Sequence, residues 1–295
     1  MTSADIGGVT IEYDIRGEGQ PLLLVMGLGA QLIHWPDEFV TQLADRGFRV
    51  IRFDNRDIGL STKMPGTRPG RARTIGGLLS RRLAKSEYLL SDMADDAAGL
   101  LDHLGIERAH VVGVSMGGMI AQSLTIDHPA KVASLTSIMS NTGDRRHGKP
   151  AMALIRRAPQ FLNSDPEKML DNGVAIGRLI SGPHFDEKAE RELIQRAVER
   201  DGDATGTARQ IMAISASPDR TAGLRKVTAP TLVIHGLRDV LVLASGGIAT
   251  AKAVANSRLL MFPDMGHDLP RQRWGEIIDA IVANTERAPS HLAVR

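Results

Sequence analysis

The fold is decided by one stretch of sequence, Ala109-His-Val-Val-Gly-Val-Ser-Met-Gly-Gly-Met-Ile120. Its first five residues form a short apolar run, which predicts a strand buried in a sheet, and residues 116–127 have the composition of a helix that starts immediately afterwards. Between them lies Gly113-Val-Ser115-Met-Gly117, a G-x-S-x-G pattern. The pattern alone is weak, but a strand before it and a helix after it predict a strained turn that exposes the serine hydroxyl at the carboxyl end of the sheet.

Working outward from this turn, strands and helices alternate with short connections from residue 21 to about residue 140, and again after Pro230. Such alternation predicts an α/β fold with a mostly parallel twisted sheet and helices on both faces. The expected strands are 9–11 and 12–15 with a turn at 17–19, then 21–26, 49–53, 109–113, 132–138, 231–234 and 258–262. The expected helices are 36–46, 91–104 with Ser91 or Asp92 as N-cap, 116–127, 245–255 and 272–284.

The alternation is interrupted by a segment with helical patterns and no clear strand. Its candidate helices are 150–157, 167–180, 188–200 and 206–215, separated by Pro and Gly. We therefore predict a core in two parts, 1–140 and 227–295, with a helical cap at 141–226, and a loose tail over 286–295.

Composition excludes several classes of function. The 36 basic and 34 acidic residues nearly cancel, so the charge balance favours neither nucleic acid nor a membrane surface as a partner. The absence of cysteine excludes disulfides, thiolate nucleophiles and cysteine zinc sites. We see no membrane span, signal peptide, H-E-x-x-H pattern or glycine-rich nucleotide motif, which favours a soluble cytoplasmic protein without a metal or cofactor.

A serine hydroxyl needs a base, and the base needs an orienting acid. His267 lies in a loop between a predicted strand and the last helix, and Asp239 lies in the loop after the 231–234 strand. The chain order Ser, Asp, His is the one expected for a nucleophile elbow on such a sheet. Asp264 and Asp268, which flank His267, are better explained as groups that cap the loop or support the site without contacting the substrate, and Asp219 is a weaker alternative acid.

Acyl transfer also requires N–H donors for the developing oxyanion. The N–H of Met116 follows the nucleophile directly, and the loop Met26-Gly-Leu-Gly29 follows the 21–26 strand. We expect the N–H groups of Met116 and Leu28 to form the oxyanion hole.

These motifs resemble those of the α/β-hydrolase fold superfamily over nearly the whole chain. Asp54-Asn-Arg-Asp-Ile-Gly-Leu-Ser61 is similar to the D-x-R-G-x-G-x-S segment of the superfamily, and His235-Gly-Leu-Arg-Asp239 matches its acid loop. Trp35-Pro-Asp-Glu-Phe39 and Val114-Ser-Met-Gly117 are similar to the aclacinomycin methylesterase-like carboxylesterases. Two positions depart from the pattern: Met26 replaces the usual His of the oxyanion loop, and Asp57 replaces a usual Gly.

The resemblance implies a carboxylic ester hydrolase that binds ligands between cap and core and works through an acyl-enzyme. Its expected partner is a small, apolar ester, and a homodimer remains open. Alternatives on the same triad are a carbon–carbon bond hydrolase, a thioesterase and a cofactor-free perhydrolase, with a non-catalytic receptor as the other class. Epoxide hydrolases and haloalkane dehalogenases are disfavoured, because they need a carboxylate at position 115.

Overall fold

The computed structural model describes residues 2–66, 69–70, 76–77, 80–152, 154, 169–203 and 205–289, without the side chain of residue 169. The described strands form one eight-stranded sheet in the order β1-β2-β4-β3-β5-β6-β7-β8. The pairs β1–β2 and β2–β4 are antiparallel, and all other neighbours are parallel. The predicted mostly parallel sheet is therefore confirmed. The strands are β1 (Thr2–Ile6), β2 (Val9–Arg16), β3 (Gln20–Val25), β4 (Phe48–Phe53), β5 (Ala109–Val114), β6 (Val132–Ile138), β7 (Thr231–Gly236) and β8 (Ser257–Phe262).

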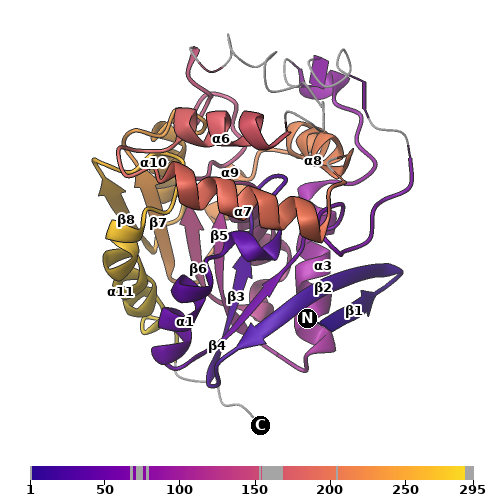
Figure 1. The fold of residues 1–295 in the computed structure, drawn as a ribbon. Helices are drawn as coiled ribbons and strands as arrows, with labels where there is room; N and C mark the ends of the chain where they lie inside the picture. Colours follow the sequence, from indigo (N-terminus) through magenta and orange to yellow (C-terminus); the bar gives the residue numbers. More distant parts are fainter. Residues whose placement is uncertain are drawn as a thin grey trace.

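Helices cover both faces of the sheet (Figure 1), because the central strands bury side chains in both directions. In β3, Leu23 and Val25 join the core under α3 (Leu90–His103) and α4 (Met116–Asp127), whereas Leu22 and Leu24 join the core under α1 (Asp37–Asp45) and α11 (Trp274–Thr285). This division follows from the alternation of side chains along a strand. The helices of this part are α1 (Asp37–Asp45), α3 (Leu90–His103), α4 (Met116–Asp127), α10 (Ser245–Ala253) and α11 (Trp274–Thr285).

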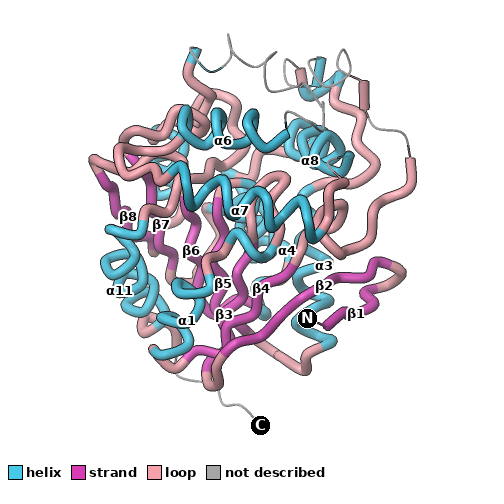
Figure 2. Tube along the Cα trace, viewed as in Figure 1, coloured by secondary structure: helices cyan, strands magenta, loops and turns pink. Residues whose placement is uncertain are grey.

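Further helices lie over one end of the sheet, in the upper part of Figure 1 and Figure 2. They are α6 (Met169–Ile180), α7 (Glu187–Arg200) and α8 (Thr205–Ala216), followed by the short α9 (Thr221–Leu224). All four fall within 141–226, and we keep the division at 140 and 226 as a proposal and call residues 141–226 the cap segment. The predicted helix 150–157 lies mostly outside the described residues, as does the end of the predicted tail.

Two sequence predictions were wrong in detail. The N-terminal hairpin pairs β1 with one continuous β2 through a turn at Gly7 and Gly8, instead of two strands within 9–15. Helix α3 has Leu89 as its N-cap residue, and Asp92 accepts the Leu89 N–H from within the first turn at 2.6 Å. None of the helices among the described residues has the length and hydropathy needed to cross a membrane.

Candidate active site

Ser115 occupies the sharp turn between β5 and α4. Its backbone has φ 57° and ψ −119°, a left-handed conformation that non-glycine residues rarely adopt. The Ser115 N–H donates to the carbonyl of Ile138 in β6 at 2.8 Å, which ties the turn to the neighbouring strand. Strain of this kind costs about 1–3 kcal/mol and persists only where the surroundings impose it.

The glycines of the motif allow α4 to approach the sheet closely. A Cβ atom at Gly117 would lie 2.0 Å from the carbonyl oxygen of Val25, and one at Gly113 would lie 2.2 Å from the carbonyl oxygen of Gly117. Both contacts involve backbone, which cannot move aside as a flexible side chain can. The motif therefore needs small residues at these two positions for packing, independently of any chemistry.

The structure brings Ser115, His267 and Asp239 into one hydrogen-bonded chain. His267 Nε2 lies 2.9 Å from Ser115 Oγ, and His267 Nδ1 lies 2.7 Å from Asp239 Oδ2. Because an ionised carboxylate only accepts, Nδ1 carries the proton and Nε2 is free to accept the proton of the serine hydroxyl. Asp239 is fully buried, and the His267 side chain is 7% exposed.

The buried Asp239 carboxylate is held by several N–H groups. Its Oδ1 accepts from the N–H groups of Leu241 at 2.9 Å and Val242 at 2.8 Å. Burial alone would raise the pKa of Asp239, but the hydrogen bonds from His235 and His267 outweigh burial and lower it. The carboxylate is thus kept ionised beside the imidazole.

His235 is a residue of this site that the sequence analysis did not single out as a candidate for catalysis. Its Nε2 donates to the carbonyl of Val242 at 2.7 Å and lies 3.3 Å from Asp239 Oδ2. The ring is completely buried, and its Nδ1 has no hydrogen-bond partner among the described residues. The signal was present in the sequence, since His235 belongs to the same short motif as Asp239.

The other candidate acids lie elsewhere. Asp264 pairs with His184 at 2.7 Å and Arg273 at 2.9 Å. Asp268 accepts the Gly266 N–H at 2.8 Å, which fits the loop-capping role predicted for this residue. Asp219 accepts from Thr221 at the start of α9. Of the four candidate aspartates, the one that contacts His267 through its carboxylate is Asp239.

The loop after β3 lies against Ser115. A Cβ atom at Gly27 would be 3.3 Å from Ser115 Cβ and 3.8 Å from Ser115 Oγ. Met116 is the first residue of α4, where backbone N–H groups have no intrahelical acceptor. Within the described residues, the N–H groups of Leu28 and Met116 donate to no protein group. Neither N–H group is therefore occupied by a protein acceptor in this part of the chain.

The cap segment contacts the site through the end of α6. The His267 N–H donates to the carbonyl of Ile180, the last residue of α6, at 2.7 Å. Asp57, which departs from the family pattern, has φ 75° and pairs with Arg209 of α8 at 2.6 Å. Asp54 pairs in the same way with Arg200 of α7 at 2.6 Å. Core and cap segment are thus joined by two buried ion pairs.

Within the described part of the chain, no group of three or more His, Asp or Glu side chains is arranged to hold a metal ion.

Comparison with known proteins gives a consistent picture. A family model described as alpha/beta hydrolase fold matches residues 20–270. Rhodomycin D methylesterase DauP of Streptomyces sp. (strain C5) is 28% identical over 291 residues, which cover 91% of each chain. The 2-hydroxymuconate semialdehyde hydrolase of Pseudomonas sp. (strain CF600) is 28% identical over 274 residues, with 90% of this chain and 89% of the relative covered. The enol-lactonase structure from Burkholderia xenovorans LB400 superimposes with a TM-score of 0.76 at 23% identity, covering 97% of this chain and all of that one, a likeness of fold.

Proposed function

Because the chain belongs to the α/β hydrolase fold family, we propose that it is a serine hydrolase that cleaves small carboxylic esters without a cofactor, through an acyl-enzyme. The observation that carries this proposal is the continuous chain from Ser115 Oγ through His267 to Asp239, with contacts of 2.9 and 2.7 Å. The methylesterase relative, which aligns along most of its length, supports an ester as the substrate.

In the proposed mechanism, Ser115 Oγ attacks the ester carbonyl carbon while His267 Nε2 takes the hydroxyl proton. Asp239 stabilises the imidazolium that forms and keeps the ring in the tautomer with Nδ1 protonated. The N–H groups of Leu28 and Met116 bind the oxyanion of the tetrahedral intermediate. His267 then gives the proton to the departing alkoxide, and the alcohol leaves.

Deacylation repeats these steps with water as the nucleophile. His267 removes a proton from the water, hydroxide adds to the acyl carbonyl, and the C–O bond to Ser115 breaks. The proton returns to Ser115 Oγ as the acid is released. Apart from the ester and one water molecule, neither half of the proposed reaction uses a group from outside this chain.

A second candidate is hydrolysis of a carbon–carbon bond beside a ketone. It is favoured by the similarity to 2-hydroxymuconate semialdehyde hydrolase. A panel of p-nitrophenyl esters, alkyl esters and ring-cleavage type dienoates separates the two, since the preferred class has the higher kcat/KM.

The decisive experiment replaces the nucleophile. Ser115→Ala is expected to lower turnover of a short-chain p-nitrophenyl ester to background and to abolish labelling by a fluorophosphonate. Ser123→Ala, on a buried serine of the same helix, serves as the matched control and should keep both properties. Substantial turnover by Ser115→Ala with an unchanged fold would refute the proposal.

A further inference from the structure

The loop that carries the Leu28 N–H is held by the cap segment as well as by the core. The Gly29 N–H, one peptide further on, donates to Oε1 of Gln210 in α8 at 2.9 Å. On the core side, Asn55 Nδ2 donates to the carbonyl of Met26 at 2.9 Å. The two ends of the short segment around Leu28 are therefore fixed by different parts of the chain.

Gln210 spans the junction with both ends of its amide. Its Nε2 donates to the carbonyl of Arg56 at 3.0 Å while its Oε1 accepts from Gly29, and the side chain is completely buried. An amide that lost these partners would be costly to bury, since an unsatisfied buried group costs about 1–3 kcal/mol. The position on α8 is thus used to connect the loop after β3 to the loop after β4.

The loop also lies tightly against α8. Gly29 has φ 69°, and a Cβ atom there would be 3.0 Å from Thr207 Oγ1. A left-handed residue in direct contact with α8 leaves little freedom for the peptide between Leu28 and Gly29. The hydrogen bond from Gly29 to Gln210 then sets the orientation of that peptide.

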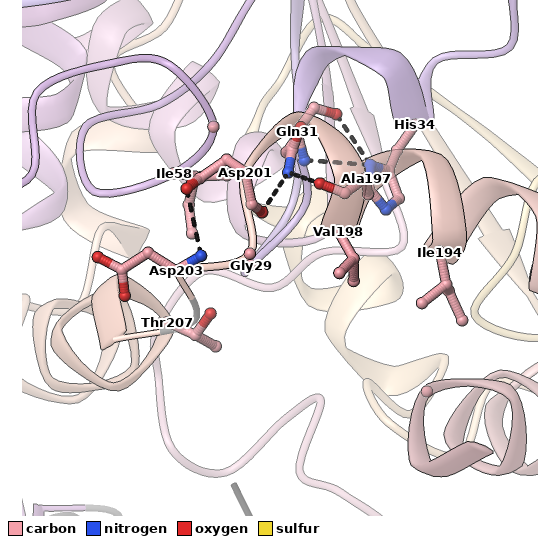
Figure 3. A pocket seen from close by; sticks show the side chains of 13 residues that line it. Gly29, Gln31, His34, Ile58, Ile194, Ala197, Val198, Asp201, Asp203 and Thr207 are labelled. Atoms are coloured by element: carbon pink, nitrogen blue, oxygen red, sulfur yellow. Dashed lines mark hydrogen bonds between the residues drawn. The ribbon is translucent and has the colours of Figure 1, made fainter. Parts of the chain in front are cut away.

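A second contact fixes the far end of the loop. Gln31 Nε2 donates to the carbonyls of Ala197 at 2.7 Å and Asp201 at 3.2 Å, at the C-terminal end of α7. Figure 3 shows this amide between the two carbonyls, beside a pocket of about 190 Å³ that Gly29 and Gln31 help to line. The loop is thus held by both α7 and α8.

We infer that Gln210 is a positioning residue for the oxyanion hole, through which the seating of α8 on the core sets the direction of the Leu28 N–H. The inference rests on the proposed function, because it takes Leu28 as an oxyanion donor. Displacement of one donor weakens stabilisation of the transition state more than binding of the ground state, so the effect belongs in kcat.

The test compares three variants of the full chain. Gln210→Met is close in size to Gln and removes both hydrogen bonds. Gln210→Glu keeps an acceptor for the Gly29 N–H. Ser217→Ala is the matched control, because Ser217 Oγ accepts the Leu90 N–H at 2.9 Å and so also joins the cap segment to the core, away from the loop.

Each variant is titrated with a fluorophosphonate to count active molecules, and kcat and KM are measured on one p-nitrophenyl ester. Inhibition is measured with a trifluoromethyl ketone of the same acyl chain. Ser115 Oγ adds to its carbonyl carbon, the hydroxyl proton passes to His267, and the resulting hemiketal oxyanion occupies the hole.

Gln210→Met is expected to lower kcat by about tenfold or more with KM within about twofold, and to weaken the ketone by a similar factor. Gln210→Glu should retain more of kcat than Gln210→Met, and Ser217→Ala should keep kcat and the inhibition constant even if its Tm falls. Equal losses of kcat in Gln210→Met and Ser217→Ala, or an unchanged kcat in Gln210→Met, would overturn the inference. If instead Ser115→Ala keeps its activity, the proposed function itself fails, and the two failures are distinguishable.

Discussion

The ion pair between Asp57 and Arg209 provides a sharp test of how the cap segment is held. The Asp57 carboxylate is completely buried, and the Arg209 side chain is 6% exposed. Arg209 Nη2 and Nε donate to it at 2.6 and 3.0 Å, and the pKa of Arg209 is raised by this hydrogen bond. Tyr88 donates to the same carboxylate at 2.6 Å, and the Met64 N–H at 2.8 Å.

Arg209→Met would leave the buried carboxylate without its cation. Breaking a buried pair by removing one partner costs about 3–5 kcal/mol. We expect about 3 kcal/mol, the lower end, because Tyr88 and Met64 still donate to Asp57. For a chain of this length that corresponds to a fall in Tm of about 5 °C.

The double variant Asp57→Gly/Arg209→Met removes the buried charge together with its partner. Glycine also adopts φ 75° without the strain of about 1–2 kcal/mol that a side chain suffers in the left-handed region. We therefore expect the double variant to regain at least half of the lost stability, although Tyr88 and the Met64 N–H both lose their acceptor. Thermal unfolding followed by circular dichroism measures all three proteins, and a double variant less stable than Arg209→Met would refute the reasoning.

Four further predictions concern the site and its support. Asp239→Asn should lower kcat by about 10³–10⁴ while fluorescence and Tm show an intact fold, and an activity loss below tenfold would exclude Asp239 as the triad acid. His235→Phe removes the Nε2–H beside Asp239, and we expect kcat per titrated site to fall by about tenfold; an unaltered kcat would make His235 purely structural. Burial lowers the pKa of His110 to about 4, so between pH 6.5 and 4 the unfolded chain binds a proton that the folded chain does not. The stability that depends on neutral His110 is complete above pH 6.5, and about 3 kcal/mol of it is lost as the pH falls to 4. Denaturant unfolding of His110→Gln should show a shallower acid slope than wild type, and equal slopes would contradict the assignment. Gly117→Ala should unfold the elbow or abolish expression of folded protein, because its Cβ would meet backbone at 2.0 Å; a folded, active variant would show that the packing argument is wrong.

The core could be predicted because its signals are local. The run Pro21-Leu-Leu-Leu-Val25 is apolar throughout, and a strand buried on both faces has this composition. The expected and observed ends of the central strands and their helices agree within about two residues in most cases. The edge strand β1 has no such run, because most of its residues are exposed, and it was therefore missed.

The positions of the three candidate triad residues could also be predicted from the sequence. Each of its members follows a predicted strand, and the carboxyl ends of parallel strands meet at one edge of the sheet. Topology therefore brings Ser115, Asp239 and His267 together before any side chain is placed. The hydrogen-bond partner of an individual side-chain atom could not be predicted in this way. For His235 the sequence motif was recognised, but the contact of its ring with Asp239 depends on the side-chain rotamers in a buried loop.

The cap segment shows why the remainder could not be predicted. Helical periodicity indicates that α8 exists, but it does not say which residue of the core each of its side chains meets. Gln210 and Arg209 are adjacent in sequence, yet one connects two loops through an amide and the other neutralises Asp57, a residue about 150 positions earlier. Asp57 departs from the family pattern within one turn, yet its ion-pair partner lies in the distant helix α8, and that helix also holds the loop of the proposed oxyanion hole. It follows that substitutions on the face of α8 that contacts the core should alter turnover as well as stability. A helix that only covered the substrate would not be expected to have this effect on the loop after β3.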